Sequence, residues 1–207
     1  MITRYLICVC LLTLISCGGG NDNSTFQNPQ TSSCGPFDAS SSSDYLLPYS
    51  IGTAFFLNQS NCSGFGHSGF WTYGYDFTMD IGTQVVAMRD GTVVHTQDGT
   101  IDGNPNGTNL ILIEHSDGTI ALYSHLTING VLVFIGQQIE VGDLIGLSGN
   151  TGNTGGLPHL HVSLHPCIGL PGLTGIPNTN CPTQPFNFNN VESGSDNLIA
   201  RRNYLAI

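Results

Sequence analysis

Residues 109–123 read NLILIEHSDGTIALY, and this stretch decides the fold. Its two halves are rich in β-branched and other apolar side chains, as β-strands are. The corner Ser116-Asp117-Gly118 contains an Asp-Gly pair, which favours a tight hairpin turn. We therefore predict two antiparallel strands, over 109–115 and 119–123, joined by this turn.

The same pattern of short apolar runs between turn residues continues on both sides of the hairpin. No stretch shows a long apolar period of 3.6 residues, and 27 glycines suit many tight turns. The sequence thus predicts a mainly β fold, a compact antiparallel β-sheet domain over 45–190 with few or no helices. Further strands are expected over 84–88, 91–95, 139–146 and 159–165.

Composition limits the functions that this chain can perform. The 207 residues suffice to bury a core, and they include 4 Lys and Arg against 14 Asp and Glu, a net charge of −10. Phosphate binding needs clusters of Lys and Arg, so a nucleic-acid partner is not expected.

The first residues predict export. Arg4 precedes an apolar run over 6–15, which is too short to span a bilayer core of about 30 Å as a helix. Residues 1–16 then form a signal peptide, and Cys17 resembles the lipidated cysteine of the bacterial lipobox. The alternative is an ordinary signal peptide with an incidental cysteine. Gly18 resembles the outer-membrane sorting pattern, which implies a lipid-anchored protein of the cell envelope that faces the periplasm.

The segments flanking the predicted domain carry weaker signals. Residues 17–44 are rich in Gly, Asn, Ser and Thr, which predicts a flexible tether. Residues 191–207 are expected to form a C-terminal tail, either a short helix or a frayed end.

Four cysteines remain after the predicted signal peptide and Cys17. An even number in an exported chain suggests disulfides, and four cysteines allow three connectivities. Closeness in sequence favours Cys34–Cys62 and Cys167–Cys181. A zinc site made of these four cysteines is disfavoured, because no pair of them has the short spacing of structural zinc ligands.

Two of the seven histidines, His159 and His161, are expected on one strand and therefore on one face of the sheet. Taken alone, this His-x-His pattern more often marks two surface histidines on an edge strand. Its context is more specific, because five motifs occur in order over residues 65–165. They are Tyr75-Asp76-Phe77, residues 82–93, Tyr123-Ser124-His125-Leu126, residues 142–152 and Pro158-His159-Leu160-His161.

In that order the motifs resemble the lysostaphin-type (LytM-like) zinc metallopeptidases, which mostly cleave peptidoglycan peptides. The resemblance implies a zinc-dependent endopeptidase with Zn²⁺ as cofactor and peptidoglycan peptides as substrate. Asp76 and His161 would be metal ligands, and His125 and His159 the catalytic pair. Catalytic zinc takes three N or O ligands from the protein and leaves a position for water.

The third ligand departs from the family pattern. A histidine is expected four residues before Asp76, where this chain has Thr72. The nearest upstream histidine is His67, nine residues away, and a loop over 70–73 would let it reach the metal. We therefore predict His67 as the third ligand. The alternatives are a catalytically inactive domain that binds and regulates other cell-wall hydrolases, or a structural domain of the envelope.

The remaining histidines carry simpler expectations. His95 is interpreted as an ordinary strand residue, His115 as a polar group near a turn, and His165 as a surface residue, with the site as its alternative place. Aromatic residues near the predicted ligands are expected either to wall a substrate groove or to face the core: Phe70, Trp71, Tyr73 and Tyr75.

Overall fold

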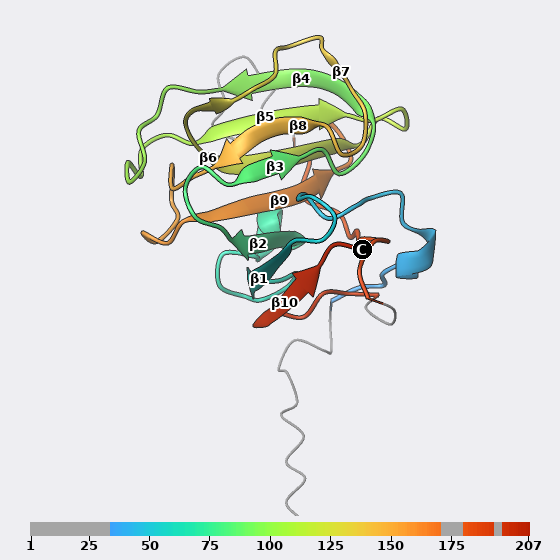
Figure 1. Cartoon of the computed structure of the whole chain (residues 1–207). Helices are drawn as coiled ribbons and strands as arrows, with labels where there is room; N and C mark the ends of the chain where they lie inside the picture. The colour runs from blue at the N-terminus through green and yellow to red at the C-terminus, as the bar shows by residue number, and fades with distance from the viewer. Residues whose placement is uncertain (1–33, 171–179, 193–195) are drawn as a thin grey trace, which may run out of the picture.

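Figure 1 presents a computed structural model, which describes residues 34–170, 180–192 and 196–207. A ten-stranded antiparallel sheet organises these residues, and the only helical elements in the described part are two short 3₁₀ turns, η1 (Ser40–Ser42) and η2 (Gly69–Trp71). The prediction of a mainly β antiparallel fold is confirmed. The strands are β1 (Ala54–Gln59), β2 (Gly74–Thr78), β3 (Gln84–Val86), β4 (Gly91–Gln97), β5 (Asn109–Glu114), β6 (Ile120–Val131), β7 (Gln138–Ile139), β8 (Leu144–Ser148), β9 (His159–His165) and β10 (Arg202–Leu205).

The strand order places β9 in the middle of the sheet. The order is β10-β1-β2-β9-β6-β5-β4-β7, and β8 pairs with β6 and β3 beside this path. Strands β2 and β6 therefore flank β9 on either side, as Figure 1 shows. All seven residues of β9 are buried, because both faces of this central strand are covered.

One face of the three central strands builds the main core. Alternate residues point to this face, among them Phe77 of β2, Tyr123 of β6 and Val162 of β9, all fully buried. Aromatic residues from later in the chain close over it, and Phe188 lies 6.1 Å from Phe77 between ring centroids. The other face of β2 and β9 carries the polar residues of the predicted site.

The predicted hairpin is present. Strands β5 and β6 pair antiparallel, and Gly118 in the turn has φ 81°, which glycine adopts without steric cost. Strand β6 runs on to Val131, well beyond the predicted end at residue 123. The extension pairs with β8, a partner that local sequence does not reveal.

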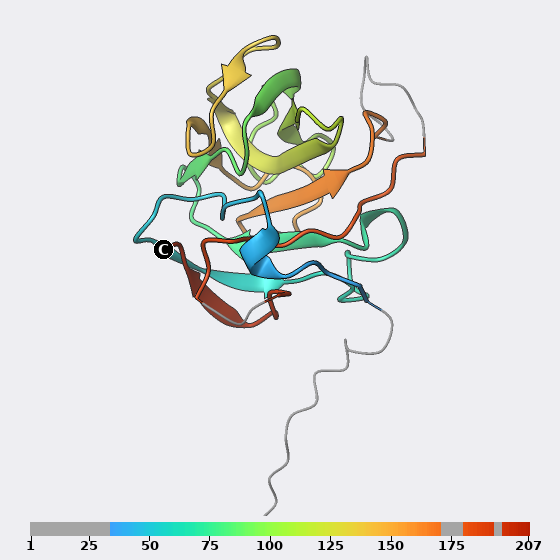
Figure 2. The ribbon, with the colours of Figure 1, turned by 90° about the vertical axis from the view of Figure 1, so that its right-hand side faces the viewer.

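The sheet also extends past the predicted domain boundary at residue 190. Residues 202–205, expected in a tail that is helical or frayed, form β10 and pair with β1. Figure 2 shows β10 beside β1 at the lower edge of the molecule. Both strands are short and lie at one end of the sheet. Neither has a strong alternation of apolar and polar residues of its own. Tertiary pairing supplies their structure.

Both predicted disulfides are present, Cys34–Cys62 and Cys167–Cys181. The last part of the expected tether, residues 34–44, lies against the domain through the first of these bonds and through Ser43, whose hydroxyl donates to the Asn187 carbonyl. The predicted signal peptide (1–16), Cys17 and the rest of the tether lie outside the described residues. Within the described part, no helix is long and apolar enough to cross a membrane.

Candidate metal centre

Pairing between strands aligns the first two predicted ligands. Asp76 on β2 lies directly opposite His161 on β9, which in turn lies opposite Ser124 on β6. Residues directly opposite each other on neighbouring strands share a face, so the three side chains form a row across the sheet. Nδ1 of His161 is 2.7 Å from Oδ1 of Asp76.

His67 reaches this row from the loop that precedes β2. Its Nε2 lies 3.2 Å from Oδ1 of Asp76 and 3.3 Å from Nδ1 of His161. The other ring nitrogen, Nδ1, donates to the Ser60 carbonyl at 2.9 Å. This bond fixes the tautomer in which Nε2 presents a lone pair to the centre.

The nine-residue spacing closes because the loop doubles back on itself. The 3₁₀ turn η2 takes up the extra residues, and the Cys62 N–H donates to the Thr72 carbonyl at 2.7 Å. Thr72, which occupies the usual ligand position, directs its own hydroxyl to the Gly69 carbonyl instead. The disulfide from Cys34 holds Cys62 at the start of the same loop.

The donor atoms of His67, Asp76 and His161 all lie within 4.8 Å of one another, and the three side chains are buried. Two imidazole nitrogens and a carboxylate oxygen are the ligand types that catalytic zinc takes. Ligands about 2.0–2.2 Å from a tetrahedral metal are separated by roughly 3.3–3.6 Å. The two separations that involve His67 Nε2, 3.2 and 3.3 Å, are close to this range, and that between His161 and Asp76, 2.7 Å, is shorter. A neutral His67 and the Asp76 carboxylate both present lone pairs here, so a cation fits between them.

Gly74 leaves the space that the two imidazoles occupy. A Cβ at this position would lie 2.8 Å from Cε1 of His161 and 3.2 Å from Nε2 of His67. Contacts shorter than 3.0 Å are essentially never made by real Cβ atoms. Position 74, opposite Ser163 on β9, therefore requires glycine, because the two ligand rings pack against it.

His125 joins the site through a β-bulge in β6. Ser124 pairs with Leu110, yet Leu126 pairs with the adjacent Asn109, so His125 is the extra residue. It has φ 65°, in the left-handed region. The bulge reverses the alternation and turns His125 to the face that holds Ser124 and His161, as bulges beside active sites commonly do. Its ring centroid lies 6.1 Å from that of His161.

His159 completes the group. Its ring centroid lies 4.7 Å from that of His125, and its Nε2 is 3.9 Å from Oδ1 of Asp76. Nδ1 of His159 donates to the Leu157 carbonyl at 2.8 Å, and Nδ1 of His125 donates to the Thr151 carbonyl at 2.6 Å. Both rings therefore keep Nε2 as the nitrogen that can exchange a proton with a substrate.

The electrostatics of the centre favour a charged aspartate and act in opposite directions on His67 and His125. Burial opposes ionisation of Asp76, but hydrogen bonds and charge from His161 and His67 hold its pKa well below the usual value. Burial acts against protonation of His67, yet the Asp76 carboxylate raises the pKa of His67. Burial, together with the nearby His159 and His161, lowers the pKa of His125 to about 3.

The other histidines lie apart from this group, and one expectation about them is wrong. His165 was expected at the surface but is fully buried, because its face of β9 is covered by Trp71 and the segment around Cys181. Its Nδ1 donates to the Cys181 carbonyl at 2.8 Å. Trp71 also packs edge-on to His161, with ring centroids 6.0 Å apart, so this aromatic residue supports the ligand ring.

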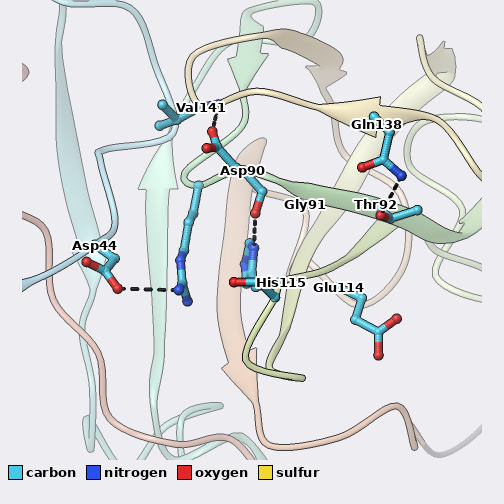
Figure 3. Close-up of a pocket in the computed structure, with 10 residues that line it drawn as sticks. Asp44, Asp90, Gly91, Thr92, Glu114, His115, Gln138 and Val141 are labelled. Carbon is cyan, nitrogen blue, oxygen red and sulfur yellow. Dashed lines mark hydrogen bonds and ion pairs between the residues drawn. The ribbon is translucent and has the colours of Figure 1, made fainter.

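A cavity of about 620 Å³ lies elsewhere in the molecule and contains none of the five predicted site residues. Figure 3 shows His115 and Asp90 in its wall, joined by a bond from Nδ1 of His115 to the Asp90 carbonyl. His95 lies on β4. The sequence did not indicate the backbone carbonyls of Ser60, Thr151 and Leu157, because a carbonyl acceptor has no side-chain signature.

Comparison with known proteins identifies a family for part of this chain. The model of peptidase family M23 matches residues 71–169. This chain carries a peptidase family M23 domain. His67 lies just ahead of the matched segment, as its unusual spacing would lead one to expect.

Curated relatives of the M23 domain include peptidoglycan hydrolases. The chain is 43% identical over 91 residues to the peptidoglycan DD-endopeptidase ShyA of Vibrio cholerae, a match that covers 44% of this chain and 19% of the relative. It is 38% identical over 96 residues to lysostaphin of Staphylococcus simulans, covering 46% of this chain and 18% of the relative. The chain thus spans about a fifth of the length of these relatives.

Two solved structures are also similar to this chain. A zinc-containing peptidase from Vibrio cholerae matches 62% of this chain and 37% of its own chain, at 28% identity and a TM-score of 0.39. The antimicrobial peptidase lysostaphin from Staphylococcus simulans matches 62% of this chain and 47% of its own, at 28% identity and a TM-score of 0.44.

Proposed function

We propose that the M23 domain is a zinc-dependent endopeptidase that hydrolyses peptide bonds of peptidoglycan in the cell envelope. The observation that carries the proposal is the convergence of His67, Asp76 and His161, with His125 and His159 beside them. A domain that had lost its activity would not need to keep five such residues together. The relatives named as peptidoglycan endopeptidases support the choice of substrate.

In this proposal, His67 Nε2, Asp76 Oδ1 and His161 Nδ1 hold the zinc ion. Bound there, zinc would supply a Lewis acid for the substrate carbonyl and would lower the pKa of water to about 7. Asp76 contributes the only negative charge of the ligand set, and its low pKa keeps it ionised at neutral pH. The buried position of all three side chains limits competition from water.

The two remaining histidines divide the proton transfers between them. Nδ1 of His125 is held by the Thr151 carbonyl and Nε2 keeps a lone pair, so Nε2 accepts the proton of the attacking water. His159 lies near Asp76, forms an ion pair with it when protonated, and then donates from Nε2 to the substrate oxygen as negative charge develops. The backbone carbonyls of Leu157 and Thr151 keep both rings in the required tautomer.

Metal content and hydrolysis of purified peptidoglycan test the proposal together. The purified protein is expected to contain about one zinc per chain and to release soluble fragments. His161→Ala should abolish both properties, whereas His95→Ala, outside the centre, should leave them unchanged. Folded wild-type protein that holds zinc but releases no fragments would favour the inactive, regulatory alternative. Folded protein without zinc would contradict the proposal entirely.

We also propose that the protein is anchored through a lipid on Cys17, at the outer membrane facing the periplasm. The apolar run over 6–15 and the cysteine that follows it support this placement. Cys17→Ser should move the protein from the membrane fraction to the soluble fraction of lysed cells. Retention of the variant in the membrane fraction would contradict the proposal.

A further inference from the structure

The bulge that turns His125 toward the metal centre opens the hydrogen-bond ladder between β5 and β6. At a bulge the extra residue is unpaired, and the neighbouring backbone groups lose their regular partners. Here the Asn109 N–H and the Leu126 carbonyl flank the extra residue. Both groups are buried, and a buried backbone group without a partner is strongly disfavoured.

One side chain satisfies both groups. The Thr151 hydroxyl accepts a hydrogen bond from the Asn109 N–H at 3.0 Å and donates to the Leu126 carbonyl at 2.7 Å. Thr151 has no exposed surface, so water does not compete for these bonds. The hydroxyl therefore occupies the opening in the ladder and holds the bulge in its observed form.

The backbone of the same residue holds the imidazole. Nδ1 of His125 donates to the Thr151 carbonyl at 2.6 Å. Thr151 thus fixes both the backbone that aims His125 and the tautomer of its ring. The adjacent Gly152 permits this close approach, because a Cβ there would lie 2.1 Å from the Thr108 hydroxyl and 3.3 Å from Nδ1 of His125.

A carboxylate anchors the loop that carries Thr151. Asp102 accepts hydrogen bonds from the Asn150 N–H and from the Thr127 hydroxyl, each at 2.6 Å. Asn150 precedes Thr151 in the chain, and Thr127 lies two residues beyond His125. Asp102 therefore ties the loop to the strand that contains the bulge.

We propose that Thr151 is a positioning residue, which holds His125 in the orientation and Nδ1-protonated tautomer that proton transfer requires. The part of this inference that concerns hydrolysis rests on the proposed function. The part that concerns the His125 ring does not, because the geometry of the bulge is independent of any reaction. A purely structural Thr151 would stabilise the fold without affecting the ring.

Substitutions that differ only in the hydroxyl test the proposal. Thr151→Val keeps the shape and the backbone carbonyl but removes both hydroxyl bonds, whereas Thr151→Ser keeps the hydroxyl. Ser148→Ala is the matched control, because it removes an equally buried hydroxyl that bonds to the Asp80 carbonyl. All variants are made in the whole chain, and zinc content and melting temperature are measured for each.

The decisive readout is the tautomer of His125, from long-range ¹H–¹⁵N NMR correlations of its ring. Wild type, Thr151→Ser and Ser148→Ala should show a proton fixed on Nδ1, and Thr151→Val should lose this single form. If the protein hydrolyses peptidoglycan, kcat of Thr151→Val should fall by about 10- to 100-fold, with little change in KM or zinc content.

An unchanged His125 tautomer in folded Thr151→Val would overturn the proposal, whatever happens to the melting temperature. If that variant does not fold, Asp102→Asn provides a second test, because it loosens the loop that carries Thr151 without changing Thr151 itself. It should weaken the single Nδ1-protonated form, and an unaffected ring would again count against the proposal. A wild-type protein without hydrolytic activity would refute the proposed function, while the NMR comparison would still decide the role of Thr151.

Discussion

The cavity wall and the metal centre each contain a buried histidine whose Nδ1 donates to a backbone carbonyl, but only the second has the chemistry of a metal centre. In the wall of the cavity in Figure 3, His115 donates to the Asp90 carbonyl. Beside it, Arg89 forms ion pairs with Asp44 and Asp117. At the metal centre, by contrast, His67 and His161 converge on the carboxylate of Asp76.

The difference shows that the size of a hollow does not identify the reactive site here. The cavity of about 620 Å³ offers room, but its carboxylates and His115 form no group of three converging donor atoms among the described residues. The row across β2 and β9 instead brings three donor atoms within 4.8 Å of one another, and no Lys or Arg among the described residues pairs with Asp76. Convergence of several donor atoms on one point is the property that a divalent metal requires.

Exchanging a ligand for alanine should produce the largest contrast between the two regions. His161→Ala is expected to remove zinc and to lower hydrolysis by more than about 100-fold, beyond the range typical of outer-shell partners. His115→Ala should leave both unchanged. Metal analysis and peptidoglycan assays of the two variants check this, and equal effects would abolish the distinction.

The unusual ligand spacing predicts a second strong contrast. His67→Ala should lose zinc as completely as His161→Ala, because either change leaves only two protein ligands. Thr72→Ala, at the usual ligand position, should retain the metal, since the Thr72 hydroxyl bonds to the Gly69 carbonyl. Zinc titration of both variants decides the matter, and a Thr72→Ala protein without zinc would show that the ligand assignment is wrong.

A smaller effect is expected from crowding the ligand rings. Gly74→Ala places a methyl group against His161 and His67, so zinc affinity should fall by about 10- to 100-fold. Gly107→Ala is the control, because the atoms nearest to its Cβ would belong to the Thr100 side chain and not to a ligand ring. Competition with a chelator measures both affinities, and equal values would mean that the rings shift without cost.

The smallest effect concerns the charge pair beside the cavity. Burial would raise the pKa of Asp117, but hydrogen bonds from Thr119 and Arg89 lower it below the usual value. A carboxylate with a lowered pKa stabilises the fold above its unfolded-state pKa, and this contribution is lost as pH falls through the folded value.

Asp117→Asn should therefore reduce the free energy of unfolding at pH 7 by less than about 1 kcal/mol, as for partly exposed ion pairs. The difference from wild type should shrink as pH falls below about 4. Urea unfolding at several pH values measures it. A difference that grows in acid would contradict the assigned sign.

The parts of the fold that the sequence predicts are those with local signals. Strand β9 matches its predicted range of 159–165, and the Asp-Gly turn lies where expected, because alternation and turn chemistry are properties of neighbouring residues. Strands β1 and β10 depend on each other across most of the chain. No local pattern could reveal that pairing.

The candidate site divides in the same way. Asp76 and His161 were found through motifs on strands, and the register between β2 and β9 brings them together. The reach of His67 depends on how η2 and the Cys34–Cys62 bond fold the loop, which residue spacing alone does not determine. The bulge at His125 has no side-chain signature, because Thr151 stabilises it from a distant loop.

The position of zinc in the protein tests the central claim most directly. Crystals of the zinc-loaded protein, measured at the zinc absorption edge, should show one strong anomalous peak. The account predicts that this peak lies about 2.0–2.2 Å from Nε2 of His67, Oδ1 of Asp76 and Nδ1 of His161. A peak beside His115, or a zinc-loaded protein in which these three residues bind no metal, would contradict it.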